Sequence, residues 1–339
     1  MDTVLALSPF FLGPQHLVHK PDSPEAFLLD AGTPVRQNFT FAAELPEAHP
    51  LFSDTTTPFH DLLFPVEALR QAAMFAARQY FRVPTKRITA VSASSTEITD
   101  VDPWRRTGES SRIALDLALT PVDVVTGVPR GLECEAVVSI GGRRCGRADG
   151  RLVFLSPGVH RGHRDAGRRQ SEESIAAGWG HLDSAGVPAP EQVGHRDPRN
   201  VVIGLPVEDE DDGEQLLFPV DGAAAAAVLS DGSGEVPPAL FLEASRQAAL
   251  IAAAELNGFV PSHALLTHWQ ATFRGLAEPG LPLYCTVRGQ QPGGGALAGG
   301  APRVTVRDGA GRPTARLRLT FLQGDREVAQ VSVTVLQDC

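Results

Sequence analysis

The sequence lacks the signatures of several large protein classes. No apolar run is long enough to cross a bilayer, although hydrophobic residues make up 42% of the 339 residues. It contains no glycine-rich phosphate loop, no dinucleotide-binding fingerprint, no G-x-S-x-G nucleophile motif and no helix-turn-helix pattern. These absences argue against a membrane protein, a nucleotide-dependent enzyme, a serine hydrolase and a helix-turn-helix repressor. We expect a protein that needs no cofactor.

Cysteine is scarce, and its spacing does not favour a metal site. The four cysteines are Cys134, Cys145, Cys285 and Cys339. None forms a C-x-x-C pair or lies in a Cys/His cluster, so we expect no zinc. Cys134 and Cys145 could face each other across a hairpin, or both could be buried thiols in a reducing compartment.

Lysine is almost absent, with two residues among the 30 basic ones, and the net charge is −10. An acidic chain is a poor non-specific ligand for nucleic acid, so we expect no nucleic-acid partner. The apolar stretch near the N-terminus has no basic residue before it and no small-residue cleavage site. That pattern does not favour a signal peptide, and we therefore expect a cytoplasmic protein.

What the sequence does contain is a long duplication. V-E-A-L-R-Q-A-A-M-F-A-A-R-Q at 66–79 and L-E-A-S-R-Q-A-A-L-I-A-A-A-E at 242–255 agree at eight of fourteen positions. A Val-Pro follows each copy, and then come runs in which apolar and polar residues alternate, as in half-buried antiparallel strands. Each half therefore predicts a long alanine-rich helix followed by four or five strands. A shorter strand is expected before each helix, around 35–43 and 215–220.

This repeat predicts two domains of similar fold, at 1–155 and 199–339. The segment between them, 156–198, is rich in Gly, Pro, Arg and His and is predicted to be a linker, which could carry a short helix at 171–179. The acidic run at 208–214 and the glycine-rich run at 289–300 are predicted to be loops.

Each predicted helix carries one polar triplet near its start: Glu67, Arg70 and Gln71 in the first, and Glu243, Arg246 and Gln247 in the second. The spacing puts the three side chains on one face of a helix that is otherwise apolar. Buried charges must be paired or functional. The triplet could be an intrahelical Glu–Arg pair that closes the core. Alternatively, the two copies could meet across a pseudo-twofold interface and build one cleft.

A helix wrapped by a curved antiparallel sheet, with a Glu near its start, resembles the hotdog fold. The doubled form resembles the A-factor biosynthesis (AfsA) hotdog family. The matching stretches are LVHKPDSPEAFLLD at 17–30, LPEAHPLF at 45–52, HDLLFPVEALRQAA at 60–73, DPRNVVIG at 197–204 and VPPALFLEASRQAA at 236–249. The resemblance implies an α+β fold of tandem hotdog domains that form a pseudo-dimer, so a monomer could be enough, although a homodimer stays open.

The same resemblance implies a synthase for γ-butyrolactone, butenolide or related signalling molecules. In the implied reaction, an acyl carrier protein delivers a β-ketoacyl group to a hydroxyl of dihydroxyacetone phosphate. Acyl transfer to an alcohol needs a base, and a buried carboxylate can serve. The phosphate needs a cationic partner, for which arginine is well suited.

We predict Glu67 as the base and Arg246 as the phosphate or oxyanion ligand, with Glu243 and Arg70 as their counterparts in the other half. Gln71, Gln247, His49 and Asp61 are predicted to contact substrate, as are Arg70 and Arg246. His49, His60 and Asp61 match the family's His-Pro and His-Asp positions. His60 is a candidate second acid/base group. These histidines could also cap loops, and His19 is expected to support structure.

The match fails in the loop before the second helix. The family pattern has a His-Pro and an Asp-His there, but this chain has FPVDGAAAAAVLSDGSGEVPPA, in which Glu235 replaces the histidine and Pro238 a glycine. Two other functions therefore stay open. One is another hotdog enzyme on acyl thioesters, a dehydratase or a thioesterase, although dehydration normally needs a His–Glu pair. The other is a non-catalytic, ligand-binding relative.

A basic stretch could serve as the surface for an acidic carrier protein. Residues 143–169 contain eight arginines against Asp149 and Asp165, a local net charge of +6. The same stretch could equally be a solvated linker.

Overall fold

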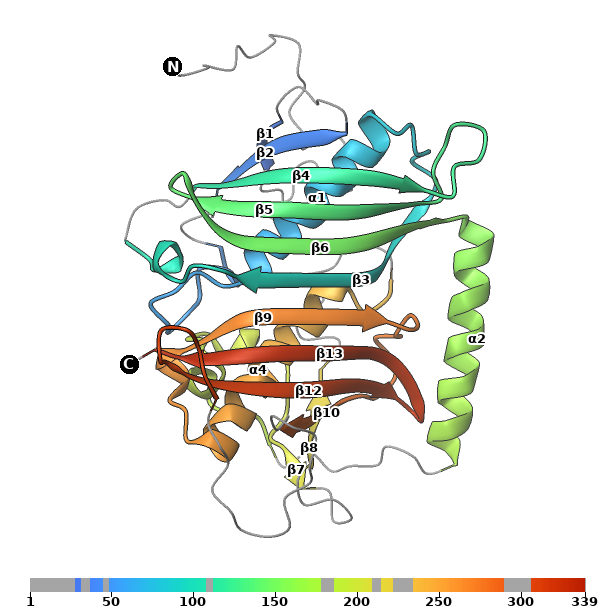
Figure 1. Cartoon of the computed structure of the whole chain (residues 1–339). Helices are drawn as coiled ribbons and strands as arrows, with labels where there is room; N and C mark the ends of the chain where they lie inside the picture. The colour runs from blue at the N-terminus through green and yellow to red at the C-terminus, as the bar shows by residue number, and fades with distance from the viewer. Residues whose placement is uncertain are drawn as a thin grey trace, which may run out of the picture. The chain divides into compact units, whose positions relative to one another are not determined.

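The computed structural model describes residues 28–31, 37–44, 49–107, 112–177, 186–208, 215–221, 234–289 and 306–338 (Figure 1). His19, Cys339, the five-alanine run at 223–227 and nearly all of the predicted loops at 208–214 and 289–300 lie outside these residues. The contacts divide the chain into two units, Met1–Ser53 with Phe64–Pro157 and Asp54–Leu63 with Gly158–Cys339. The predicted domain limits at 155 and 199 stay predictions, but the second unit also takes a ten-residue loop from the first half of the chain.

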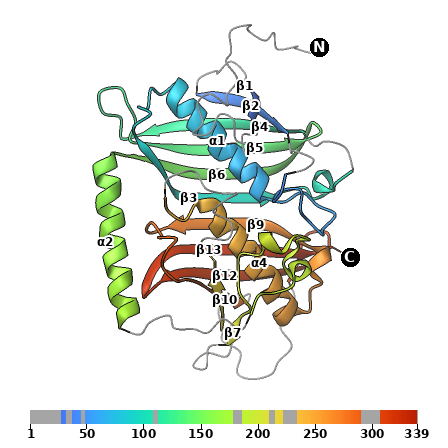
Figure 2. The same cartoon turned by 180° about the vertical axis from the view of Figure 1, so that it is seen from behind.

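The first unit is an antiparallel sheet with one long helix on it. Its elements are β1 (Leu28–Ala31), β2 (Asn38–Glu44), α1 (Leu63–Gln79), β3 (Ile88–Ile98), a 3-10 turn (Asp102–Trp104), β4 (Arg112–Val122), β5 (Gly131–Ile140) and β6 (Arg143–Leu155). The strand order is β1-β2-β4-β5-β6-β3. Helix α1 crosses one face of this sheet in both views (Figure 1 and Figure 2).

Alanine makes up much of the buried part of α1. Ala68, Ala72, Ala73, Ala76 and Ala77 are all buried. A methyl side chain lets the backbone of the helix approach the strands, while alanine has the highest helix propensity. In the sheet, β4 alternates buried and less buried residues, with Ile113, Leu115, Leu117 and Leu119 buried. The predicted pattern of helix and half-buried strands is confirmed here.

The second unit repeats this plan and adds a helix. Its elements are α2 (Pro157–Ala176), 3-10 turns at Pro190–Val193, Pro198–Asn200 and Pro261–His263, β7 (Val207–Glu208), β8 (Gln215–Val220), α4 (Pro238–Asn257), β9 (Ala264–Phe273), β10 (Leu283–Gly289), β11 (Val306–Arg307), β12 (Pro313–Gln323) and β13 (Arg326–Gln337). The strand order is β9-β13-β12-β10-β8-β7, and β11 pairs with β12. Helix α4 contacts strands β8, β9, β10, β12 and β13, and its residues from Leu240 to Ala253 are all buried.

Helix α2 is longer than the short helix predicted at 171–179, and it begins fourteen residues earlier. Two polar pairs hold it to the rest of the second unit. Arg164 donates from Nε and Nη2 to the Glu278 carboxylate, at 2.8 and 2.5 Å. The His160 Nε2 atom lies 3.1 Å from Glu235 Oε2, and both side chains are buried. These tertiary contacts stabilise a segment whose composition resembles a linker.

The described residues contain neither a paired cysteine nor a helix suited to span a membrane. Cys134, Cys145 and Cys285 are buried free thiols, so of the two readings for Cys134 and Cys145 the structure favours unpaired thiols. Within the part of the chain that the structure describes, no helix is both long and apolar enough to span a membrane.

Candidate active site

The polar triplet of α1 forms an intrahelical cluster in the first unit. Arg70 donates from Nε to Glu67 Oε2 at 2.7 Å and from Nη2 to Glu67 Oε1 at 2.6 Å. Gln71 Nε2 donates to the same Oε1 atom at 3.0 Å, and Arg70 Nη1 lies 2.9 Å from the sulfur of Met74. The Glu67 side chain is 10% exposed and that of Arg70 is 26% exposed. This cluster is therefore partly open to solvent.

The triplet of α4 makes the same pair but is fully enclosed in the second unit. Arg246 donates from Nε to Glu243 Oε2 at 3.0 Å and from Nη2 to Oε1 at 2.6 Å. Gln247 Nε2 donates to Oε1 at 2.6 Å. The Glu243 side chain has no exposed area, and only 7% of the Arg246 side chain is exposed. The intrahelical Glu–Arg pair that the spacing suggested is thus present in both helices.

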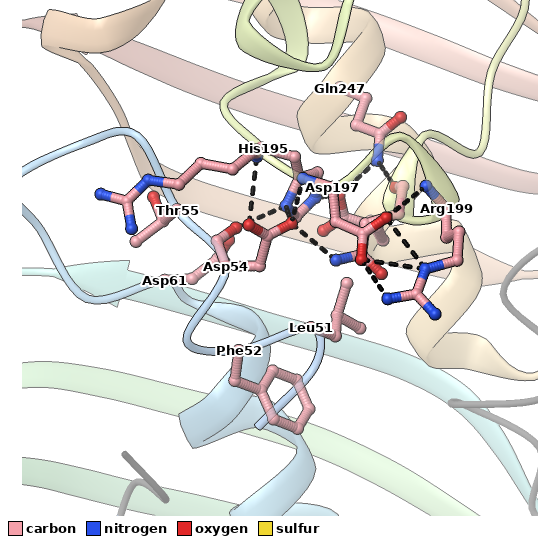
Figure 3. Close-up of polar contacts among 12 residues, drawn as sticks. Leu51, Phe52, Asp54, Thr55, Asp61, His195, Asp197, Arg199 and Gln247 are labelled. Atoms are coloured by element: carbon pink, nitrogen blue, oxygen red, sulfur yellow. Dashed lines mark hydrogen bonds and ion pairs between the residues drawn. The ribbon is translucent and has the colours of Figure 1, made fainter. Parts of the chain in front are cut away.

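Two further segments reach this second cluster (Figure 3). Asp61 Oδ2, from the loop before α1, lies 3.0 Å from Arg246 Nε. His195 comes from the turn after α2, and its Nε2 atom lies 2.8 Å from Glu243 Oε1 and 2.7 Å from Arg246 Nη2. The other ring nitrogen, Nδ1, lies 2.6 Å from the backbone oxygen of Asp54. The second unit therefore holds four titratable side chains around one guanidinium, counting Asp54.

Asp54 orders the segment that carries His195. Its carboxylate accepts hydrogen bonds from the backbone N–H groups of Arg196 and Asp197, each at 3.1 Å, and from Asn200 Nδ2 at 2.7 Å. Gln247 holds the end of the same segment, because its Oε1 accepts from the Val202 N–H at 2.9 Å. Contacts of His195 itself with Asp54 and Glu243, and of the residues that follow it with Asp54 and Gln247, therefore fix the position of His195.

Gly194 lets this segment approach Arg246 closely. Its φ of +78° lies in the left-handed region that glycine tolerates. A Cβ at this position would lie 2.9 Å from Arg246 Nη1. Its carbonyl accepts from the N–H of Thr56 at 3.0 Å, which ties the turn to the loop that carries Asp61.

The electrostatics give the two carboxylates beside Arg246 different properties. Burial alone would raise the pKa of Glu243, but the charges of Arg246 and His195 outweigh it and lower that pKa to about 2. Burial raises the pKa of Asp61, and Arg246 only partly opposes this effect. Glu243 therefore stays ionised at neutral pH, whereas Asp61 is the carboxylate that more readily takes a proton.

A family model, the A-factor biosynthesis hotdog domain, matches residues 12–156 and again 185–337. The chain belongs to the A-factor biosynthesis hotdog family. A relative from Streptomyces coelicolor, 2-oxo-3-(phosphooxy)propyl 3-oxoalkanoate synthase, is 28% identical over 249 residues, which are 74% of each chain. Among solved structures, an oleoyl thioesterase from Lactobacillus plantarum has a TM-score of 0.51 and 12% identity, over 88% of this chain and 97% of that one. At that identity the likeness shows the fold alone, and the predicted α+β fold of tandem hotdog domains is confirmed.

In this member of the A-factor biosynthesis hotdog family, the histidines predicted from the first half differ in what they contact. The Nδ1 atom of His49 accepts hydrogen bonds from the N–H groups of Leu51 and Phe52, at 3.2 and 3.1 Å. Burial lowers the pKa of His49 to about 4, so this ring stays neutral and caps its loop. His60, the neighbour of Asp61 in the sequence, is buried. Its acid/base role stays a prediction.

The altered loop before α4 has a structural consequence. Glu235, at the place where the family pattern has a histidine, binds His160 on α2 rather than the triplet of α4. The histidine that does reach Glu243 is His195, which the sequence analysis did not single out. Its signal was its position two residues before the family-like stretch DPRN, at 197–200. Asp54 was also missed, because its role depends on contacts across more than 140 residues.

The structure also describes the surroundings of the arginines at 143–169. Several have an acidic neighbour: Arg143 with Asp100, Arg147 beside Glu97, Arg151 beside Glu133, Arg164 with Glu278 and Arg168 with Glu172. The local charge of +6 is therefore largely matched in space. A carrier-protein surface at this place stays a prediction. Among the described residues, no group of three or more His, Cys, Asp or Glu side chains could hold a metal ion.

Proposed function

We propose that this chain is a synthase that transfers a 3-oxoacyl group from a thioester to a hydroxyl of dihydroxyacetone phosphate. The observation that carries the proposal is the name of the relative, which gives its product as 2-oxo-3-(phosphooxy)propyl 3-oxoalkanoate. That compound is the ester of a 3-oxo acid with dihydroxyacetone phosphate. Family membership over both halves of the chain supports the same reaction.

The reaction needs a base and a cationic site. The hydroxyl oxygen attacks the thioester carbonyl and forms the new C–O bond, which gives a tetrahedral oxyanion. This oxyanion then collapses, the C–S bond breaks, and the thiolate leaves and takes up a proton. A general base accepts the hydroxyl proton, and donors stabilise the oxyanion. We propose Glu67 as the base, because its side chain is 10% exposed, whereas Glu243 is enclosed and has a pKa of about 2.

The phosphate is best matched by the arginine that faces fewer carboxylates and is more exposed to solvent. Arg246 lies against two carboxylates, Glu243 and Asp61, so a third anion there would be repelled. Arg70 pairs with Glu67 and is 26% exposed. We therefore propose Arg70 as the first choice for the phosphate. The predicted role of Arg246, and its sharing of one site with Glu67, stay predictions that the same assay tests.

The test is a single assay with matched variants. Purified protein is mixed with a 3-oxoacyl thioester and dihydroxyacetone phosphate, and mass spectrometry measures the phosphorylated ester and the released thiol. Glu67→Gln, Arg70→Ala and Arg246→Ala are compared with Glu133→Gln, an exposed carboxylate on β5. We expect ester from the wild type and from Glu133→Gln, and at least 100-fold less from Glu67→Gln. An intact thioester with wild-type protein would refute the proposal.

One observation supports a second candidate, dehydration of a 3-hydroxyacyl thioester. The sequence predicted no His–Glu pair in the second half, but His195 Nε2 lies 2.8 Å from Glu243 Oε1. A dehydratase would remove one water from a 3-hydroxyacyl thioester without using dihydroxyacetone phosphate. A thioesterase would instead release free acid. A parallel reaction with a 3-hydroxyacyl thioester tests for dehydration, and mass spectra of the two reactions distinguish the three products.

The partners follow from the proposed reaction. We propose that the thioester arrives on an acyl carrier protein, that the reaction takes place in the cytoplasm, and that a monomer suffices because the chain already contains two hotdog domains. Chain length and branching of the acyl group are left to the assay, which can include a series of thioesters.

A further inference from the structure

The environment of His195 assigns the hydrogen on one of its ring nitrogens. Its Nδ1 atom lies 2.6 Å from the backbone oxygen of Asp54 and 3.3 Å from Asp54 Oδ2. A carbonyl oxygen only accepts hydrogen bonds, and so does a carboxylate oxygen when ionised. The Nδ1 atom must therefore carry a hydrogen, which leaves Nε2 as the atom that can gain or lose one.

The Nε2 atom faces one acceptor and one donor. Glu243 Oε1 lies 2.8 Å away and can only accept, whereas Arg246 Nη2 lies 2.7 Å away and can only donate. With a hydrogen on Nε2, the ring donates to Glu243. Without it, the ring accepts from Arg246. Nε2 thus has a hydrogen-bond partner in either protonation state, so it can gain or lose a proton with little movement of the ring.

Charged side chains from several segments surround the ring of His195. His195 faces Asp54 from the loop before α1, and Glu243 and Arg246 from α4. Asp61 and Asp197 interact with it through their charges. Two guanidinium groups oppose these carboxylates, that of Arg246 beside the ring and that of Arg199, which forms an exposed pair with Asp197.

We propose that His195 is a positioning residue that holds the mobile proton of the second unit and thereby orients Glu243 and Arg246. The hydrogen bond from Nδ1 to the Asp54 carbonyl fixes the tautomer of His195. In catalytic histidines, a hydrogen bond at one ring nitrogen likewise determines the state of the other. The kinetic part of this inference rests on the proposed function, but the tautomer does not.

The first test needs no substrate. Full-length protein labelled with ¹⁵N in its histidines is measured by long-range ¹H–¹⁵N NMR, and His195→Gln identifies the signal of His195. We expect Nδ1 to give the signal of a protonated nitrogen, and Nε2 to change with pH. His195→Asn provides the assignment if His195→Gln does not fold. A signal that shows Nδ1 without a hydrogen would overturn the proposal.

The second test separates proton holding from simple support. His195→Gln keeps an N–H that can donate to Glu243, but an amide does not titrate near neutral pH. We expect kcat to fall about 100-fold, with KM changed less than threefold, and the pH dependence of kcat to flatten. A role in support alone would lower the melting temperature but leave the shape of the pH profile unchanged, and that result would overturn the proposal.

His160→Gln is the matched control, because it removes the other buried His–Glu contact of the second unit, His160 with Glu235. We expect it to lower stability and to keep the wild-type pH profile. If the same flattening appeared in His160→Gln, the proposal would also be overturned. If the wild type made no ester, the proposed function would have failed, and the NMR signal of Nδ1 would still decide the assignment of His195.

Discussion

Two glutamates with the same neighbours in sequence have different environments. Glu67 and Glu243 both begin an E-A-x-R-Q stretch, and both accept from the Arg and Gln that follow. Only Glu243 also meets His195, and the charges of Arg246 and His195 lower its pKa to about 2 against the effect of burial. The two copies are therefore not chemically equivalent. The α4 carboxylate is a fixed negative charge, and for this reason we propose the α1 carboxylate, and not the α4 one, for proton transfer.

This fixed charge predicts a pH dependence of stability. The pKa of Glu243 is about 2 in the folded protein against 4.5 as the reference value. A lowered folded-state pKa stabilises the protein above pH 4.5, and this contribution is lost as the pH falls towards 2. Each pKa unit corresponds to about 1.4 kcal/mol, so the contribution is about 3 kcal/mol.

Glu243→Gln removes the titrating group. Urea unfolding of the wild type and of Glu243→Gln, from pH 6 to pH 3, should show a stability difference that narrows below pH 4.5. A difference that stays constant with pH would contradict the lowered pKa.

Gly194 gives a second prediction at a single residue. An alanine there would be strained at a φ of +78° and would also press on Arg246 Nη1. Gly258 is the matched control, because its φ is +70° but a Cβ would meet nothing within 4 Å. We expect Gly258→Ala to lower the free energy of unfolding by about 1 kcal/mol. Gly194→Ala should lower it by about 1 to 3 kcal/mol more, because crowding a packed site adds to the strain. Equal losses in the two variants would mean that Arg246 moves aside freely.

At the scale of elements, the sequence predicted what local patterns determine. The two alanine-rich helices and the alternating strands follow from periodicity, and the structure confirms them. Helix α2 was predicted too short because Gly158, Gly162 and Gly167 lower its helix propensity. Its length instead depends on contacts with residues far away in the chain, such as Glu235 and Glu278, and a local pattern does not contain these.

The anchoring of α2 can be tested with two arginines of the same helix. Arg164→Ala would leave Glu278, whose side chain is only 6% exposed, without its ion pair. We expect a loss of about 2 kcal/mol in the free energy of unfolding. Arg168→Ala removes a pair within the helix that is 57% and 45% exposed, and we expect no measurable change in the urea midpoint. Equal midpoints for the two variants would show that the Glu278 contact does not hold α2.

The difference between local patterns and contacts distant in sequence also explains which site residues could be predicted. The Glu, Arg and Gln of each helix follow from spacing on one face, and the structure brings each triplet together. His195 lies in what the composition predicted to be a linker, and its partner Asp54 is 141 residues away. The sequence marks His195 only by its position before the stretch DPRN, and it gives no signal for the contact with Asp54, because neither residue belongs to a periodic element.

At the scale of the whole molecule, the compact units do not follow the order of the chain. The loop Asp54–Leu63 precedes α1, yet it belongs to the second unit with Gly158–Cys339. It supplies Asp61 beside Arg246, Thr56 beside Gly194 and Asp54 beside His195. A duplicated domain predicts two self-contained halves, whereas here the second cluster is incomplete without ten residues from the first half of the sequence.

Asp54 tests this dependence because its carboxylate holds three donors of the segment 196–200. Asp54→Ala leaves the carbonyl that faces His195 in place but removes all three bonds. We expect a loss of about 3 kcal/mol in the free energy of unfolding. The amide hydrogens of Arg196 and Asp197 should also exchange faster. Arg199→Ala is the control, because it removes an exposed pair with Asp197 in the same turn and should change neither quantity. If Asp54→Ala behaved like Arg199→Ala, the Asp54 carboxylate would be a passive neighbour of the second unit, and the Asp54 carbonyl and α4 would be enough to orient His195.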